Sequence, residues 1–408
     1  MADAETTIAL VGLGGYGQVY LESLLDNPQR DGWRIVAAFD PEPERCSYLA
    51  RLNALQVPIL DSSDEFYAAI EADLVVVSSP IQMHCEQTCA ALERGAAVLC
   101  EKPAAAVVQD VDRMIAARNA CGGIVAIGFQ WSFSRGIRDL KRDILSGLFG
   151  APRRFRSLTL WPRDESYYRR NNWAGRLRDD AGRWVLDSPA NNAMAHDLHN
   201  MLFVLGDEPA GSAVPASVTA ETYCANQIET FDTVAARVIT KGGVEILFIA
   251  SHATSEVANP VFSGEFENAT VEYAGDDSPI IARCADGSVR EYPSPQADPQ
   301  TAKLWCCVDA LREGAEIPCG LEAARSHTLC VNGIHESSPR AGRFPDPMIE
   351  RSGAAGRVLT HVPGLAEALR RCYAQAELPS ESGHPWAEAN ESVSLDDYRE
   401  FPRSGPER

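Results

Sequence analysis

A glycine-rich turn near the start of the chain constrains the fold more than any other feature. The apolar run 8–11 leads into Gly12, Gly14, Gly15, Tyr16 and Gly17, and a helical pattern follows to Leu25. In such a unit the first glycine permits a tight turn and the second lets the backbone approach a pyrophosphate. The third lets helix and strand pack closely. The N–H groups of the first helical turn would face the phosphates. These residues are therefore predicted to bind a dinucleotide.

An acidic residue follows the next apolar run. Residues 33–39 end at Asp40, about the separation expected for the acid that hydrogen-bonds an adenosine ribose. A carboxylate accepts from both ribose hydroxyls and repels a 2′-phosphate, for which a site usually offers arginine. Arg45 is the only cation close by. The sequence predicts NAD in preference to NADP.

Strand and helix patterns alternate through the first part of the chain. Expected strands cover residues 57–60, 73–77, 97–100 and 123–128, and expected helices cover 41–53, 63–71, 84–94 and 107–121. Alternation of this kind predicts an α/β Rossmann domain with a doubly wound parallel sheet. Ligands bind such sheets at the carboxyl ends of the strands, where Gly12, Asp40, Ser79 and Lys102 fall.

The alternation of strand and helix patterns ends near residue 152. Strand patterns follow one another without intervening helices at 154–161, 217–224, 233–240, 244–251, 261–267 and 270–273. They predict an α+β domain with a large, mostly antiparallel sheet. Helices expected at 300–312 and 321–334 close this region. The expected division is therefore 1–130, 131–336 and a C-terminal extension, 337–408.

Composition narrows the class of protein. The formal net charge of −20 over 408 residues argues against a nucleic-acid partner and against anionic membranes. No apolar run is long enough to span a bilayer. The acidic start, residues 1–5, shows no signal-peptide pattern, so a cytoplasmic location is expected. The twelve cysteines lie mostly in apolar periodic segments, which indicates reduced core thiols rather than a metal site.

The ordered set of motifs resembles the Gfo/Idh/MocA oxidoreductases, relatives of glucose–fructose oxidoreductase and inositol dehydrogenase. The motifs are GLGGYG from Gly12, SSPIQMH from Ser78, ERGAAVLCEKP ending at Pro103, GFQWSF from Gly128, the helix 196–206 and the stretch 310–324. The resemblance covers about residues 5–335. It implies an open-faced sheet that often forms oligomer contacts, and hence a homodimer or homotetramer. It also implies that Ser79, Pro80, His84 and Glu101 contact the cofactor.

Lys102, in Glu101-Lys102-Pro103, follows an apolar strand pattern. In the family this lysine lies beside the nicotinamide and the reacting hydroxyl, often after a cis peptide. The resemblance therefore implies a catalytic role for Lys102. The alternative is a surface lysine at a turn.

A second catalytic segment runs from Asp187 to His196. The family usually carries Asp-x-x-x-His at the start of a helix, with the histidine as the proton acceptor. Counting back from Gly206 places His196 at the histidine position of this motif and Asn192 at the aspartate position. Counting forward from Gly182 instead places Asp187 at the aspartate position and Asn191 at the histidine position. Helix periodicity favours His196 as the base. Asp187, Asn192 and His199 are expected to contact substrate.

An insert, residues 161–176, is rich in aromatic side chains, arginine and asparagine. Tyr168 and Trp173 would stack on sugar C–H surfaces, while the polar groups would bond hydroxyls. A subunit-contact loop or a loop packed on its own domain is an equal alternative. Trp131 is also expected at the substrate, and Ser132 stands where the family often has arginine.

Together these features predict an NAD-dependent enzyme that transfers a hydride between the nicotinamide and a sugar or cyclic polyol. Two alternatives stay open. One is an NAD-dependent glycosidase that works by transient oxidation and elimination. The other is a cofactor-binding sensor without catalysis.

Overall fold

The computed structural model describes residues 5–26 and 31–403, which form two compact units. The first unit comprises residues up to 105, then 110–133 and 299–324. The second comprises 106–109, 134–298 and 325 onward. Residues 1–4 of the acidic start lie outside the described residues.

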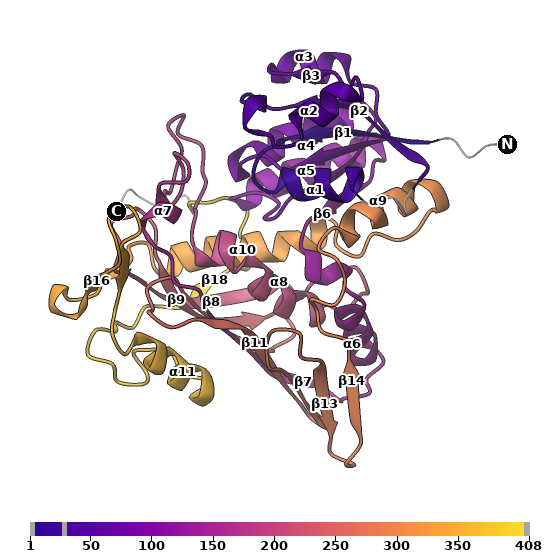
Figure 1. Cartoon of the computed structure of the whole chain (residues 1–408). Coiled ribbons are helices and arrows are strands. Elements are labelled where there is room, and N and C mark those ends of the chain that lie inside the picture. Colours follow the sequence, from indigo (N-terminus) through magenta and orange to yellow (C-terminus); the bar gives the residue numbers. More distant parts are fainter. Residues whose placement is uncertain (1–4, 27–30, 404–408) are drawn as a thin grey trace. The chain divides into compact units, whose positions relative to one another are not determined.

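The first unit contains the predicted parallel sheet (Figure 1), and the fold class is confirmed. Its strand order is β3-β2-β1-β4-β5-β6. The bounds are β1 Thr6–Val11, β2 Trp33–Phe39, β3 Ile59–Leu60, β4 Leu74–Val77, β5 Ala97–Cys100 and β6 Val125–Ile127. The helices are α1 Gly17–Leu25, α2 Leu49–Ala54, α3 Ser63–Ala69, α4 His84–Glu93, α5 Val108–Cys121 and α9 Ala302–Glu313. The order reverses between β1 and β4, which is where open α/β sheets bind ligands.

The segment after Asp40 differs from the single helix expected at 41–53. It forms a 3₁₀ turn, Pro43–Arg45, followed by the short helix α2. Pro41 and Pro43 lack backbone donors and restrict the preceding residues, so a continuous helix cannot form there.

Helix α9 belongs to the first unit, although the sequence placed residues 300–312 with the second domain. It buries Leu304 and Trp305, and the Trp305 indole N–H donates to the Ser23 hydroxyl at 3.1 Å. The Trp305 and Trp33 rings lie 6.1 Å apart. Hydrophobic periodicity reveals the apolar face of a helix but not which surface will cover it.

The second unit is built on a ten-stranded sheet. The order is β14-β13-β12-β11-β7-β10-β9-β8-β15, with β18 also paired to β8. Only the β7/β10 and β8/β15 pairs are parallel. The bounds are β7 Pro152–Leu160, β8 Pro215–Cys224, β9 Thr233–Thr240, β10 Glu245–Ser251, β11 Ala258–Phe266, β12 Ala269–Tyr273, β13 Ile280–Cys284, β14 Val289–Tyr292, β15 Gly342–Arg343 and β18 Val393–Ser394. A separate hairpin pairs β16 Glu350–Ser352 with β17 Leu359–His361.

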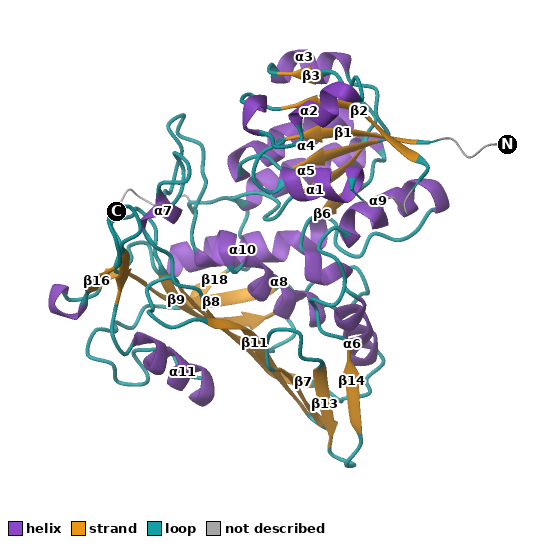
Figure 2. Ribbon diagram, viewed as in Figure 1, coloured by secondary structure: helices purple, strands orange, loops and turns teal. Residues whose placement is uncertain are grey.

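Helices cover both faces of this sheet. Figure 2 shows α8 Ala195–Val204 and α10 Leu321–Ser337 on one side and α11 Leu365–Gln375 on the other. On the first side Thr159 donates to Asp197 of α8 at 2.5 Å. Along β7 the alternate residues Leu158 and Leu160 face the other side, because successive side chains point to opposite faces.

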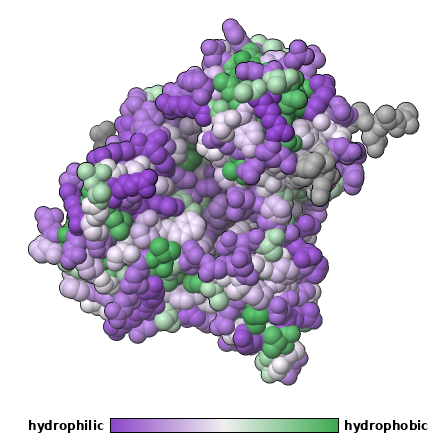
Figure 3. Space-filling view, viewed as in Figure 1, coloured by the Kyte–Doolittle hydropathy of each residue, from purple (hydrophilic) through white to green (hydrophobic). Residues whose placement is uncertain are grey.

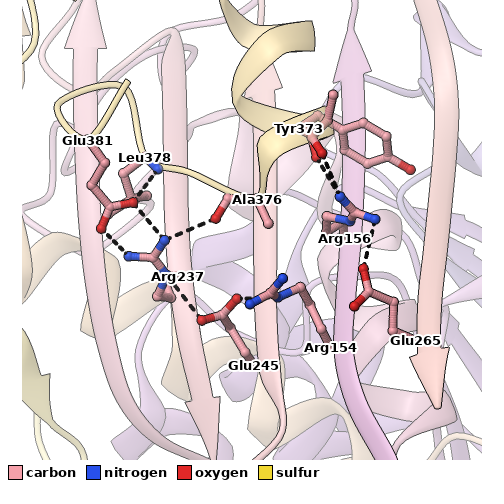
Figure 4. Close-up of polar contacts among 10 residues, drawn as sticks. Arg154, Arg156, Arg237, Glu245, Glu265, Tyr373, Ala376, Leu378 and Glu381 are labelled. Atoms are coloured by element: carbon pink, nitrogen blue, oxygen red, sulfur yellow. Dashed lines mark hydrogen bonds and ion pairs between the residues drawn. The ribbon is translucent and has the colours of Figure 1, made fainter. Parts of the chain in front are cut away.

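The C-terminal extension occupies the sheet face that was expected to be open. Leu365 and Leu369 of α11 join Leu158, Tyr223 and Leu247 of the sheet in one buried hydrophobic cluster. Figure 4 shows the polar contacts beside it, in which Arg237 pairs with Glu381 at 2.5 Å and Arg156 donates to the Tyr373 carbonyl at 3.1 Å. The extension is therefore an integral layer of the second unit.

The surface seen in Figure 3 is mainly hydrophilic, with small scattered apolar groups. Within residues 5–26 and 31–403, no helix combines the length and apolar character needed to cross a membrane.

Candidate functional site

The glycine turn has the geometry that a pyrophosphate cradle requires. Gly12 has φ +85°, and a Cβ there would lie 2.9 Å from the Ser78 carbonyl. A Cβ on Gly17 would lie 2.0 Å from the Gly12 oxygen. At Gly14, by contrast, a Cβ would meet nothing within 4 Å. Glycine is thus needed for packing at positions 12 and 17, while Gly14 faces open space that fits a cofactor.

Asp40 lies directly against this turn. Its Oδ2 accepts from the backbone N–H of Leu13 at 2.7 Å and of Gly14 at 3.3 Å, and its Oδ1 accepts from Glu42 N–H at 2.9 Å. The structure therefore brings the acid at the end of β2 to the glycine turn after β1. These residues together fit an NAD molecule whose ribose hydroxyls meet a carboxylate.

His84 joins the loops that follow β4 and β5. Its ring is buried, with Nδ1 2.8 Å from the Pro103 carbonyl oxygen and Nε2 2.9 Å from that of Ser79. Burial lowers the pKa of His84, and the two carbonyls oppose that shift. Ser79 donates to the Gln87 side chain, and Pro80 is exposed. His84 thus fixes the shape of both loops.

A buried lysine that the sequence did not single out anchors Glu101. Lys303 of α9 is 0% exposed, pairs with Glu101 Oε1, and donates to the Gly128 carbonyl at 3.0 Å. Its Nζ lies 4.4 Å from the centroid of the Tyr16 ring, and Tyr20 donates to Glu101 at 2.5 Å. Burial alone would raise the pKa of Glu101, but the Lys303 ammonium holds it below its usual value.

This anchor acts on the backbone of Lys102. The Lys102 N–H donates to Glu101 Oε2 at 3.1 Å, and the Lys102–Pro103 peptide bond is cis. The carboxylate is thereby held between Lys303 on one oxygen and the Lys102 backbone on the other. A separation of 202 residues explains why no local sequence signal revealed the pair. A lysine inside an otherwise apolar helix face was the only available clue.

Trp131 lies in the 3₁₀ turn Gln130–Phe133 after β6. It is 5% exposed, and the neighbouring Ser132 is buried. The serine therefore occupies an interior position, where an unpaired arginine would carry a large desolvation cost.

In the second unit, the buried Asp187 is hydrogen-bonded to Asn192, the other candidate for the acid position of the catalytic segment. Its carboxylate is buried at 3% exposure and accepts from the Asn192 side-chain amide at 2.7 Å and from Gly175 N–H at 2.6 Å. Arg170 forms an ion pair with it at 3.5 Å. Asp187, the acid in the register counted from Gly182, and Asn192, which takes the acid position in the register counted from Gly206, therefore share one hydrogen bond.

The segment between Asp187 and His196 is not one continuous α-helix. Pro189–Ala193 forms a π-helical turn capped by Ser188, whose hydroxyl accepts from Asn191 N–H at 3.2 Å. Helix α8 begins only at Ala195, which places His196 in its first turn. Four-residue spacing therefore does not put Asn192 and His196 on a common α-helical face. Asn191 is fully buried and donates to the Val185 carbonyl at 3.0 Å.

His199 is an interior residue. It is 1% exposed, stacks on Phe203 with ring centroids 5.8 Å apart, and lies 6.5 Å from the His327 ring. Burial holds the pKa of His199 well below its usual value, and the neighbouring His327 and Lys141 add to the shift. The ring is therefore neutral near pH 7.

The aromatic insert packs mainly on its own unit. Tyr168 lies against Gly175, and the Tyr167 ring is 5.4 Å from that of His252. The guanidinium of Arg170 lies 3.7 Å from the Tyr167 ring centroid and 5.2 Å from that of Trp173. Through its ion pair, Arg170 joins this cluster to Asp187. Tyr167 and Tyr168 therefore pack within their own unit, which was one of the alternatives to a sugar-binding role for this insert. Arg170 instead contacts Asp187, a candidate substrate residue.

Within the described part of the chain, no group of three or more histidine, cysteine or acidic residues is placed to hold a metal ion.

Comparison with known proteins identifies the first unit. Residues 6–129 match the oxidoreductase family with an NAD-binding Rossmann fold, Gfo/Idh/MocA. An inositol 2-dehydrogenase of Burkholderia cenocepacia is 28% identical over 208 residues, 51% of this chain and 56% of that protein. A 1,5-anhydro-D-fructose reductase of Ensifer adhaerens is 28% identical over 202 residues, 49% of this chain and 57% of that protein. The chain thus aligns with little more than half the length of these relatives.

Solved structures extend the likeness in fold to most of the chain. The WlbA dehydrogenase from Bordetella pertussis, in complex with NADH and UDP-GlcNAcA, superimposes with a TM-score of 0.67 at 21% identity. The match covers 82% of this chain and 97% of that one. The NAD-binding Rossmann domain at residues 6–129 is thus that of a Gfo/Idh/MocA oxidoreductase.

Proposed function

We propose that this protein is an NAD-dependent dehydrogenase acting on a CH–OH group of a sugar or cyclic polyol. The observation that carries the proposal is the anchored Glu101-Lys102-Pro103 turn, which shares a unit with the glycine fingerprint and is linked to it through Lys303 and Tyr16. The similarity to an inositol dehydrogenase and an anhydrofructose reductase supports a polyhydroxylated substrate.

Each candidate residue has a distinct role in this proposal. Bound NAD would exchange a hydride with the substrate carbon. The fingerprint and Asp40 hold the cofactor, together with Gly15, Tyr16, Ser79, Pro80, His84 and Glu101. Lys102 stabilises negative charge on the reacting oxygen, because a preorganised ammonium is most effective where water is scarce. His196 removes the hydroxyl proton. Trp131, Tyr168, Trp173, Asp187, Asn192 and His199 form or support the substrate site.

The test is a screen of sugars, inositols and glycosides with NAD, following the absorbance of reduced nicotinamide. Lys102→Ala should lower turnover roughly 10²-fold or more, with NAD affinity nearly unchanged. Lys241→Ala, at the exposed turn between β9 and β10, is the matched control and should behave as the unmodified protein. Undiminished turnover by Lys102→Ala would refute its role. Cleavage of a glycoside without net NADH would instead support the glycosidase.

The contacts of Asp40 support a preference for NAD over NADP of at least tenfold, or ~1.4 kcal/mol. Asp40→Ala should reduce this preference because the repulsion of a 2′-phosphate is lost. Calorimetric titration of both cofactors measures it, and tighter NADP binding by the unmodified protein would overturn the assignment.

A homodimer or homotetramer and a cytoplasmic location stay predictions. Because the extension covers the apolar middle of the large sheet, an oligomer built on that face would use strands β12 to β14, whose Thr270, Glu272 and Arg283 are exposed. Sedimentation velocity of the full chain, with charge reversal at Glu272 and Arg283, would test this interface.

A further inference from the structure

A pocket of about 780 Å³ lies within the second unit, and three segments distant in sequence form its walls. One is the insert around Tyr168 and Gly175, another is the connection 226–229 between β8 and β9, and the third is the C-terminal extension. Its volume is within the range of small-molecule binding sites. Neither the dinucleotide fingerprint nor the proposed proton acceptor lies among its lining residues.

The charge of this pocket opposes that of the protein. Four arginines and two glutamates line it, leaving two positive charges in excess, whereas the whole chain carries −20. Two of the arginines are already paired, Arg169 with Glu165 at 2.8 Å and Arg176 with Asp180 at 2.6 Å. The excess positive charge therefore resides on the other two arginines.

Those two arginines come from the extension. Arg343 uses one guanidinium nitrogen to donate to the Asn226 carbonyl at 3.0 Å. The backbone of Arg351 pairs in the β16/β17 hairpin, but its guanidinium makes no hydrogen bond or ion pair with any other residue that the structure describes. A guanidinium offers five N–H donors in a planar fork, which matches a carboxylate or phosphate in a bidentate manner. Both residues thus retain donors for a ligand.

The wall that faces these arginines is held rigidly. Asp232 is fully buried and accepts from the backbone N–H of Ala225 at 2.9 Å and of Asn226 at 2.8 Å, as well as from the Asn226 side chain at 2.8 Å. Gly175 has φ +70°, and a Cβ there would lie 2.8 Å from Ile228. The backbone on this side is therefore fixed by interior contacts, as in a preformed binding site.

We propose that this pocket binds a small anionic molecule bearing a phosphoryl or carboxylate group, through the guanidinium groups of Arg343 and Arg351. Gln227 and Thr360 line the same pocket, and the amide of the first and the hydroxyl of the second suit hydroxyl groups on the ligand. Tyr168, a candidate substrate residue, also lines the pocket, and Gly175 donates its N–H to Asp187, so the pocket adjoins and partly shares the candidate substrate residues of this unit. The proposal goes beyond the proposed oxidoreductase activity and does not depend on turnover.

The test is calorimetric titration of the full chain with inorganic pyrophosphate and with citrate, at low ionic strength. NAD is kept at saturation so that the glycine fingerprint is not available to the probes, and myo-inositol serves as the uncharged probe. One equivalent of pyrophosphate or citrate should bind, and the preferred probe distinguishes a phosphoryl from a carboxylate ligand. Arg351→Gln should weaken binding at least fivefold, and Arg343→Gln combined with Arg351→Gln should abolish it.

Arg357→Gln is the matched control, because Arg357 is exposed in the same segment of the extension and does not line the pocket. It should bind the probes as the unmodified protein does. Three results would overturn the proposal: no binding of either probe, retained binding in the double variant, or an equal loss in Arg357→Gln and Arg351→Gln. The last would indicate a diffuse positive surface. None of these results bears on NAD turnover, so the two proposals fail independently.

Discussion

Among the individual residues, Lys303 and Glu101 contribute most to holding the cofactor-binding unit together. Both are buried, and the desolvation of two charges is compensated by their mutual attraction and by the bonds from Tyr20 and to Gly128. Most other ion pairs, such as Arg45 with Glu42, are solvent-exposed and contribute little. The buried pair therefore couples α9 to the turn that contains Lys102.

Removing only one member of the pair should be costly. Lys303→Met leaves Glu101 buried without its cation and should lower the free energy of unfolding by about 3–5 kcal/mol. Lys303→Met combined with Glu101→Leu removes both charges and should recover more than half of that loss. Urea denaturation of the single and double variants measures the coupling. Purely additive losses would show that the two side chains do not depend on each other.

The histidines of α8 should differ in their effect on the pH profile. A neutral base makes oxidation slow down in acid, and His196→Asn should remove this acid limb together with most of the activity. His199→Asn should keep the limb, because the pKa of the buried His199 lies too far below neutrality to produce it. Turnover of a confirmed substrate between pH 5 and 8 tests this. Loss of the limb in Asp187→Asn but not in His196→Asn would make the carboxylate the base.

At the scale of elements, the sequence predicted whether a segment is a helix or a strand better than it predicted where the element ends or which surface it packs against. The strands of the first sheet were recognised because buried parallel strands are continuous apolar runs, as in β4. The π-helical turn at Pro189–Ala193 was missed, since its backbone depends on interior contacts such as the bond from Asn191 to Val185. The position of helix α11 on the sheet was not predicted either.

The packing of α11 can be tested with one matched pair of substitutions. Leu369 is fully buried in the cluster between α11 and the sheet, whereas Glu367 of the same helix is exposed. Leu369→Ala should destabilise the protein by about 2–5 kcal/mol, because it removes buried methyl groups and leaves a cavity. Glu367→Ala should change stability by less than about 0.5 kcal/mol. Urea denaturation measures both, and equal stability of the two variants would mean that α11 does not pack on the sheet.

For the molecule as a whole, buried histidines should make stability depend on pH. Burial lowers the pKa of His335 to about 4 and that of His252 to about 3. The unfolded chain binds these protons near the ordinary pKa of about 6.5, so between those values it holds more protons than the native state. The free energy of unfolding therefore decreases as the pH falls. Each of the two histidines should lower it by about 2 kcal/mol between pH 7 and pH 5.

The measurement is the free energy of unfolding at pH 7 and at pH 5. His335→Gln cannot be protonated and should reduce the loss between the two pH values by about 2 kcal/mol. An unchanged loss in this variant would show that the imidazole is already protonated in the native state or stays accessible to solvent.

The sequence by itself determined the features that arise from local order. Glycine spacing specified the turn after β1, apolar runs specified the parallel strands, and alternation specified the second sheet, because each depends on neighbours a few residues apart. It also pointed to Asp40, Lys102 and Asp187, which all stand at the ends of strands or next to a turn. The resemblance to the Gfo/Idh/MocA oxidoreductases followed from the order of these motifs.

Only the tertiary structure decided which distant groups meet. The pairing of Lys303 with Glu101 and the layer formed by the extension on the sheet both join groups whose contact is set by packing. Burial also turned His199 into an interior residue with a depressed pKa, although its helical spacing had made it a substrate candidate. Local patterns fix backbone conformation, but the desolvation and pairing of a side chain depend on surfaces contributed by the rest of the fold.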